Sequence, residues 1–135
     1  MFTINSMPHF ELQYSENLEQ VIDIAELCQA IRAEAARIDT FPMPGIRVRA
    51  TRVNHYAIAD GSAAHGFIDL SVRLRAGRTQ EVKQAAIERI FDVLRRFVEP
   101  AMSNHSIALS AEMRDIDATL SPKFGNTREH LERIA

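Results

Sequence analysis

The sequence predicts an α+β domain in which two β-α-β units form one four-stranded mixed sheet with two helices on one face. Two observations predict this fold class. Segments of strict apolar and polar alternation, typical of half-buried strands, stand before and after two longer segments with helical spacing. The chain has 135 residues, which suffices for one domain with a sizeable core and is too short for two ordinary ones.

The first half of the chain follows the order strand, helix, strand. Residues 10–14 alternate between apolar and polar side chains and predict a strand that starts near Pro8. Asn17 followed by Gln20 resembles a capping box, and the apolar spacing beyond it predicts a helix of about five turns ending near Ile38. The Pro/Gly-rich residues 41–45 break this helix, and residues 46–50 predict a second strand. The apolar phase slips at residues 51–53 and resumes at residues 56–58, which predicts a bulge or a bend.

The second half repeats this order. Gly66 precedes a predicted third strand over residues 68–75, and Thr79 is predicted to cap a second helix that Pro100 helps to end. Residues 107–114 predict a fourth strand, followed by a loop and a short polar helix after Asn126. A long helix between the strands of each half favours parallel crossovers. The second face of such a sheet carries Arg47, Arg73 and similar groups, so we expect it to meet solvent or another subunit.

Composition excludes several classes of protein. Hydrophobic residues are 46% and charged residues 25% of the chain, unlike a disordered or fibrous protein. Sixteen basic and 18 acidic side chains give a net charge of -2, so nucleic acid is not an expected partner. The longest segment without charge, residues 100–111, contains polar side chains and predicts no membrane span. The absence of a secretory signal and a single cysteine, Cys28, predicted to be buried and inert, indicate a cytoplasmic protein.

The histidines have none of the spacings that place two metal ligands on one helix face or one knuckle. They are His9, His55, His65, His105 and His130. A phosphate loop and a nucleophile elbow are also absent from the sequence. We therefore expect no metal, no cofactor and no nucleophilic hydrolase chemistry.

Two arginines occupy matching places in the two halves. Arg47 follows Pro44-Gly45-Ile46 and Arg78 follows Ala76-Gly77, each at a predicted junction of strand and loop. A guanidinium group there can reach a pocket at the edge of the sheet and hold a carboxylate bidentately. The alternative for an isolated arginine is a surface or interface ion pair.

Pro8 follows Met7 and offers a different chemistry. If translation begins at Met7, removal of that methionine leaves a prolyl secondary amine at the chain terminus. An α-amino group has a pKa of about 7.7 to 8.0, and burial or nearby arginine charge favours its neutral, proton-accepting form. The alternative is a proline that merely begins an edge strand.

Several segments together resemble one known family. They are Met7-Pro8-His9-Phe10, Phe41-Pro42 followed by Gly45-Ile46-Arg47, Ala59-Asp60-Gly61, Ala76-Gly77-Arg78, and Leu109-Ser110 with Glu112. In this order and spacing they are similar to the 5-carboxymethyl-2-hydroxymuconate isomerase family, within the tautomerase superfamily that also includes proteins like macrophage migration inhibitory factor. The resemblance extends from Pro8 to about Phe124.

The resemblance implies a cytoplasmic homotrimer of β-α-β pairs that acts without cofactor or metal in the catabolism of homoprotocatechuate, an aromatic compound. Its substrate is an unsaturated polycarboxylate, a dienol that is converted into the conjugated keto isomer. By motif position Pro8 carries the proton, while Arg47 and Arg78 hold carboxylates and polarise the developing keto group. His9 and Phe10 are candidate substrate-binding residues, and Tyr56 and Phe67 are further candidates for the lining of the same pocket. All four are equally suited to the core or to an interface.

The chain departs from the family pattern at its start. Residues 1–7 precede the proline as an N-terminal extension, and residues 8–135 form the single tautomerase-like domain. An acylated proline nitrogen is an amide and no base. Three interpretations follow: the assigned start is too early, processing exposes Pro8, or the chemistry is lost. We favour the first, and we expect a retained extension to cross or leave the mouth of the Arg47/Arg78 pocket and to suppress activity. The alternative function is a non-catalytic trimer of the same fold that binds carboxylates or a partner.

Overall fold

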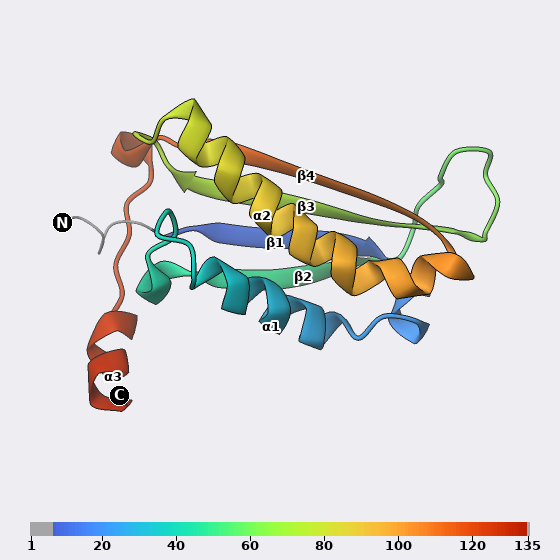
Figure 1. The fold of residues 1–135 in the computed structure, drawn as a ribbon, viewed down its shortest axis with the longest axis horizontal. Helices are drawn as coiled ribbons and strands as arrows, with labels where there is room; N and C mark the ends of the chain where they lie inside the picture. Colours follow the sequence, from blue (N-terminus) through green and yellow to red (C-terminus); the bar gives the residue numbers. More distant parts are fainter. Residues whose placement is uncertain (1–6, 135) are drawn as a thin grey trace.

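Two helices cross one face of a four-stranded sheet (Figure 1). The computed structural model describes residues 7–134. Its strands are β1 (His9–Ser15), β2 (Arg47–Val53), β3 (His65–Arg75) and β4 (Ser106–Ile116), and its α-helices are α1 (Ile24–Ala35), α2 (Gln80–Val98) and α3 (Thr127–Ile134). The strand order is β2-β1-β3-β4. β1 and β2 are parallel, β3 and β4 are parallel, and the central pair β1 and β3 is antiparallel. The predicted fold class is confirmed.

The core lies between the two long helices and one face of the sheet. Apolar side chains alternate along the central strands and point toward the helices, because successive strand residues face opposite sides. The largest side chains of this core are almost fully removed from solvent. Hydrophobic burial is therefore the main stabilising contribution. These side chains are Phe10 and Leu12 of β1, Ile68, Leu70, Val72 and Leu74 of β3, Leu27 and Ile31 of α1, and Ile90, Leu94 and Val98 of α2.

The first helix begins later than the sequence predicts. α1 starts at Ile24, and the Asp23 carboxylate caps it by accepting a hydrogen bond of 3.1 Å from a backbone N–H of the first turn. Asn17 has another role: its amide donates to the carbonyl oxygen of His65 at 2.8 Å and accepts from the Ser15 hydroxyl at 2.7 Å. These contacts tie the segment to the start of β3 and leave a 3-10 turn, η2 (Glu16–Gln20), before α1. The predicted capping box was therefore wrong.

Of the predicted bulge or bend after residue 50, the bend is formed, at His55, and the bulge is not. β2 continues to Val53 in unbroken parallel register with β1, where Ser15 pairs with Val53. Residues 54–64 then form a loop, and the predicted continuation of the strand at residues 56–58 is not formed. The apolar side chains of Tyr56 and Ile58 are half-buried in that loop, so their alternation reflects packing and not sheet pairing.

The second helix begins where the sequence predicts. The Thr79 hydroxyl accepts a hydrogen bond of 3.2 Å from the backbone N–H of Val82, which satisfies one of the free donors of the first turn. At its other end α2 passes into the 3-10 turn η4 (Glu99–Ser103), which contains Pro100.

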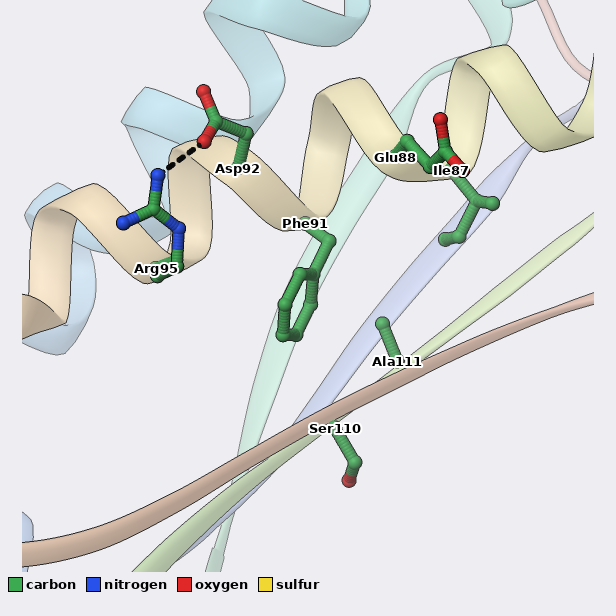
Figure 2. A pocket seen from close by; sticks show the side chains of 7 residues that line it. All are labelled: Ile87, Glu88, Phe91, Asp92, Arg95, Ser110 and Ala111. Carbon is green, nitrogen blue, oxygen red and sulfur yellow. Dashed lines mark hydrogen bonds and ion pairs between the residues drawn. The ribbon is translucent and has the colours of Figure 1, made fainter.

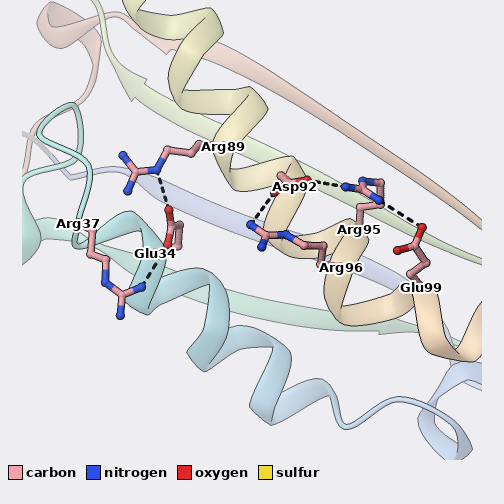
Figure 3. Close-up of polar contacts among 7 residues, drawn as sticks. All are labelled: Glu34, Arg37, Arg89, Asp92, Arg95, Arg96 and Glu99. Atoms are coloured by element: carbon pink, nitrogen blue, oxygen red, sulfur yellow. Dashed lines mark hydrogen bonds and ion pairs between the residues drawn. The ribbon is translucent and has the colours of Figure 1, made fainter.

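Charged side chains on the solvent side of α1 and α2 form a network of ion pairs (Figure 3). In this network, the ion pair of 2.6 Å between Arg89 of α2 and Glu34 of α1 joins the two helices. Asp92 forms ion pairs with two arginines of its own helix. Exposed pairs of this kind contribute at most about 1 kcal/mol each. The two helices are therefore held together mainly by the core.

The face of the sheet opposite the helices is polar, as predicted. The register places Arg47, His9, Arg73 and Arg114 in one row across it, on the side opposite Phe10. After β4, the chain turns past the end of the sheet at which β1 begins, and α3 then contacts η3 (Met43–Gly45) (Figure 1). Within residues 7–134, no helix combines the length and the apolar character needed to cross a bilayer.

Candidate functional site

Pro8 and Arg47 lie beside each other at one end of the sheet. Pro8 is buried directly before β1, and its carbonyl oxygen accepts a hydrogen bond of 3.2 Å from the backbone N–H of Arg47. The parallel pairing of β1 and β2 continues from this contact with His9 opposite Arg47. The Pro/Gly turn before β2 therefore fixes the backbone of Arg47 against Pro8, while its exposed side chain remains available for a ligand.

Arg78 comes to the same end of the sheet by a different route. Because β3 is antiparallel to β1, the turn after β3 stands where β1 begins. Gly77 has a φ of 125°, which a residue with a side chain rarely adopts, so this turn requires glycine. The half-buried Arg78 donates from Nη1 to the Arg75 carbonyl oxygen at 3.2 Å. Burial first, and then the Arg75 charge, lower the pKa of the Arg78 guanidinium.

His9 stands between two arginines on the polar face. Arg47 is its register partner on β2 and Arg73 its partner on β3. Arg49 donates from Nη1 to His9 Nδ1 at 3.2 Å. Burial first, and then the charges of Arg73, Arg49, Arg47 and Lys123, lower the pKa of His9 from 6.5 to about 4. The imidazole is therefore neutral near pH 7 and presents a polar, uncharged group in cationic surroundings.

Phe10, by contrast, belongs to the core. Its side chain is fully buried, and its ring meets the edge of Phe41 with the centroids 4.9 Å apart and the planes at 70°. Because Phe41 stands just before the turn that carries Arg47, this pair supports the backbone under the candidate site. Tyr56 and Phe67 form another edge contact, at 6.3 Å, near the opposite end of β3. The structure therefore does not bring those two aromatic residues to Pro8 within one chain.

The fold brings to this end of the sheet three further cations that were not among the predicted site residues. Arg73 and Arg75 occupy the last residues of β3 on the polar face, and Lys123 stands in the segment that follows β4. Within residues 7–131, no carboxylate lies within 4.0 Å of Arg47, Arg73, Arg75 or Lys123. The alternation of residues 68–75 predicts that Arg73 lies on the polar face of a strand. Its position opposite His9 depends on the antiparallel register of β1 and β3, which local spacing does not indicate.

A protein-family model matches the chain over this region. Residues 8–131 match the family model of 5-carboxymethyl-2-hydroxymuconate isomerase, so the match begins at Pro8 and includes every residue of the cationic end. The chain belongs to the 5-carboxymethyl-2-hydroxymuconate isomerase family. It is an isomerase, as the sequence resemblance implied.

Individual relatives are similar over nearly their whole length. The chain is 30% identical over 120 residues to the 5-carboxymethyl-2-hydroxymuconate Delta-isomerase of Escherichia coli, which covers 89% of this chain and 95% of the relative. It is 34% identical to a 5-carboxymethyl-2-hydroxymuconate isomerase from Deinococcus radiodurans R1, with a TM-score of 0.86 and coverage of 94% and 96%. A fused 4-OT described as a symmetric trimer shares the fold, with 17% identity, a TM-score of 0.57 and coverage of 81% and 85%.

A hollow of about 430 Å³ lies away from this end, between α2 and β4 (Figure 2). Ile87 and Phe91 of α2 point toward Ala111 of β4, while Ser110 points to the other side of the strand. Its one cation, Arg95, is paired with Asp92 at 2.7 Å. The lining of the hollow is mainly apolar, and the positive charge of Arg95 is already neutralised by Asp92. The hollow therefore lacks the features of a carboxylate-binding site.

Other reactive side chains of this isomerase have structural surroundings. His65 donates from Nε2 to the Asp60 carboxylate at 2.8 Å, and its Nδ1 shares a hydrogen bond of 2.7 Å with the Ser106 hydroxyl. These contacts join the loop of residues 54–64 to β4 at the end far from Pro8. Cys28 is half-buried and not fully buried as predicted, and this burial raises the pKa of its thiol. Among the described residues, no group of three or more His, Cys, Asp or Glu side chains is arranged to hold a metal ion.

Proposed function

We propose that this isomerase acts on an unsaturated polycarboxylate of the 5-carboxymethyl-2-hydroxymuconate type, with Pro8 as the N-terminal base and Arg47 and Arg78 as carboxylate-binding residues. The observation that carries the proposal is the family match that begins at Pro8. The position of both arginines at the same end of the sheet supports it. The domain that performs the reaction is then residues 8–135.

The reaction needs only the movement of a proton. The Pro8 amine takes the proton of the dienol hydroxyl as the oxygen–hydrogen bond breaks. The released electron pair forms the keto carbonyl, the double bonds shift along the chain, and the far carbon takes the proton back from the prolinium ion. The new carbon–hydrogen bond balances the lost oxygen–hydrogen bond and regenerates the amine, so general acid–base catalysis suffices.

The surroundings of Pro8 suit this role. Burial disfavours the protonated amine, and so do the positive charges of Arg47 and Arg73 nearby. His9 adds no positive charge near pH 7, since its pKa is lowered to about 4. Guanidinium groups match carboxylates bidentately and stabilise negative charge that develops on the enolate oxygen.

The test compares the full chain with a chain that begins at Pro8. In the full chain the Pro8 nitrogen is bonded to Met7 and cannot accept a proton. We expect the shorter chain to turn over the substrate and the full chain to be slower by about a hundredfold or more, the usual contribution of a general base. Pro8→Ala in the shorter chain should lower kcat, whereas Arg37→Ala, at a side chain 70% exposed in the turn after α1 and paired with Glu34, should not. The intact mass of protein from its native host shows which chain exists there. Equal turnover by both chains would exclude a prolyl amine as the base.

One observation favours a second function. Because Met7 acylates Pro8 in the full sequence, a protein that keeps its extension is a non-catalytic carboxylate-binding member of the same fold. If this second function holds, the chain that begins at Pro8 binds carboxylates but does not turn over the substrate, and Pro8→Ala in it changes little. Arg47→Met and Arg78→Met weaken carboxylate binding under both functions.

We further infer a cytoplasmic homotrimer that serves the catabolism of aromatic compounds. The polar face of the sheet, which no helix covers, and the fold shared with a trimeric fused 4-OT support the assembly. The single cysteine supports a reducing compartment. Size-exclusion chromatography with light scattering measures the molar mass of the assembly directly. A monomer at micromolar concentration would contradict the trimer.

A further inference from the structure

A small pocket opens at the end of β3, under the segment that follows β4. It has a volume of about 260 Å³ and is lined by Arg75, Ala118, Ser121, Pro122 and Lys123. Pockets that hold a whole drug-sized ligand are about 300 to 1,000 Å³. The Arg75/Lys123 pocket is therefore suited to one arm of a ligand and not to a complete polycarboxylate.

The charges of this pocket are not neutralised. Lys123 donates from Nζ to the Ser121 carbonyl oxygen at 3.0 Å and to Ser121 Oγ at 3.3 Å, both uncharged acceptors. Within residues 7–131, Arg75 has no carboxylate within ion-pair distance. Two half-buried cations and a hydroxyl thus face one small space, whereas Arg95 in the larger hollow is already paired with Asp92 (Figure 2).

The pocket adjoins the residues of the proposed site. The Arg75 carbonyl oxygen accepts the hydrogen bond from Arg78, so the backbone of one residue positions the side chain of the other. Two residues earlier on the same face of β3, Arg73 pairs with His9. On the other side, the Met7 methyl lies 3.9 Å from the position of a Cβ at Gly125, which brings the segment containing Lys123 over the start of β1.

We propose that the Arg75/Lys123 pocket binds the carboxylate of the carboxymethyl branch, while Arg47 and Arg78 hold the two carboxylates of the main chain of the substrate. This inference rests on the proposed function, whose substrate carries three carboxylates. Three separate anions need three cationic subsites, and Arg47 and Arg78 supply two. The pocket supplies the third and discriminates a branched tricarboxylate from an unbranched dicarboxylate.

The test measures the affinity for two unreactive probes by titration calorimetry. The first is 2-(carboxymethyl)hexanedioate, which has the saturated skeleton and all three carboxylates, and the second is hexanedioate, which lacks the branch. Arg75→Met and Lys123→Met each remove one charge of the pocket and keep an unbranched side chain. Lys83→Met is the matched control, because Lys83 lies at the same end of the molecule but is paired with Asp115 at 3.2 Å outside the pocket.

We expect Arg75→Met and Lys123→Met to weaken binding of the tricarboxylate about tenfold or more, as for a lost charged hydrogen bond, and to change hexanedioate binding less than about twofold. Lys83→Met should change the affinities for both probes equally and little. The titrations are made with the full chain and with the chain that begins at Pro8, after circular dichroism has shown that each variant is folded. If Arg75→Met fails to fold, Lys123→Met decides the outcome alone.

Equal losses for both probes, or no loss in either chain, would overturn the pocket assignment. Failure of the proposed function looks different, because the chain that begins at Pro8 would then lack isomerase activity while the selectivity between the two probes persisted. Conversely, turnover without any selectivity at Arg75 and Lys123 would leave the proline mechanism in place and remove the third subsite.

Discussion

Replacing His9 by glutamine tests the electrostatics of the cationic end of the sheet. Burial and the neighbouring guanidinium groups lower the pKa of His9 from 6.5 to about 4, so the folded protein binds a proton there more weakly than the unfolded chain does. The resulting stabilisation is complete above about pH 6.5 and is lost as the pH falls through about 4. The full shift corresponds to about 3.4 kcal/mol at about 1.4 kcal/mol per pKa unit. Since the ring is only half-buried, solvent screening reduces this to about 1 to 2 kcal/mol.

The assay compares urea unfolding at about pH 7 and about pH 4. We expect the free energy of unfolding to fall by about 1 to 2 kcal/mol more in the wild-type protein than in His9→Gln, because carboxylate titration is common to both. His105→Gln, which removes an exposed imidazole near the other end of the sheet, is the matched control. A nuclear magnetic resonance titration reports the pKa of His9 directly. A midpoint near 6.5, or an equal loss of stability in His9→Gln, would refute the argument.

Two further predictions concern the fold around β1 and β3. A Cβ at Gly66 would lie 2.7 Å from Cδ2 of the buried Leu18, so Gly66→Ala should destabilise the protein by about 1 to 3 kcal/mol in urea unfolding. Leu18→Ala in the same chain should cost less than the sum of the two single changes, and strict additivity would contradict the clash. Burial first, and then the hydrogen bond to Glu19, raise the pKa of Tyr14 to about 12. In a spectrophotometric pH titration, the absorbance of the Tyr14 phenolate, assigned by its loss in Tyr14→Phe, should therefore appear near pH 12. Its appearance near pH 10 would show that the contact with Glu19 is absent.

The sequence predicted those parts of the fold in which a local pattern and tertiary packing agree. The alternation in β3 and the Thr79 cap of α2 both appear as predicted, because the pattern and the buried face coincide. The prediction failed at Asn17, whose side chain bonds to His65, 48 residues away. It failed again at Tyr56, where alternating apolar residues pack in a loop. At Asn17 the deciding contact is long-range and absent from any local window.

The candidate site was predictable in part for the same reason. Pro8, Arg47 and Arg78 each stand beside a local signal, a proline before a strand or a glycine turn before an arginine. Arg75 and Lys123 carry no such signal. They lie near the site because β3 runs antiparallel to β1 and because the segment after β4 crosses the end of the sheet. The spacing of residues in the sequence predicts neither the register nor the path of that segment.

The local field at this end of the sheet reconciles the proposed binding of a polycarboxylate with a net charge of -2. The two lysines of the chain show the principle: Lys83 is neutralised by Asp115, whereas Lys123 faces Arg75 across a pocket without a carboxylate. Several acidic side chains form ion pairs elsewhere, such as those between and within α1 and α2 (Figure 3). Unpaired cations gathered at one end of the sheet create a local positive potential, and such a potential attracts small polyanions. The net charge of the whole chain therefore does not describe this end of the sheet, where the placement of unpaired cations decides the local potential.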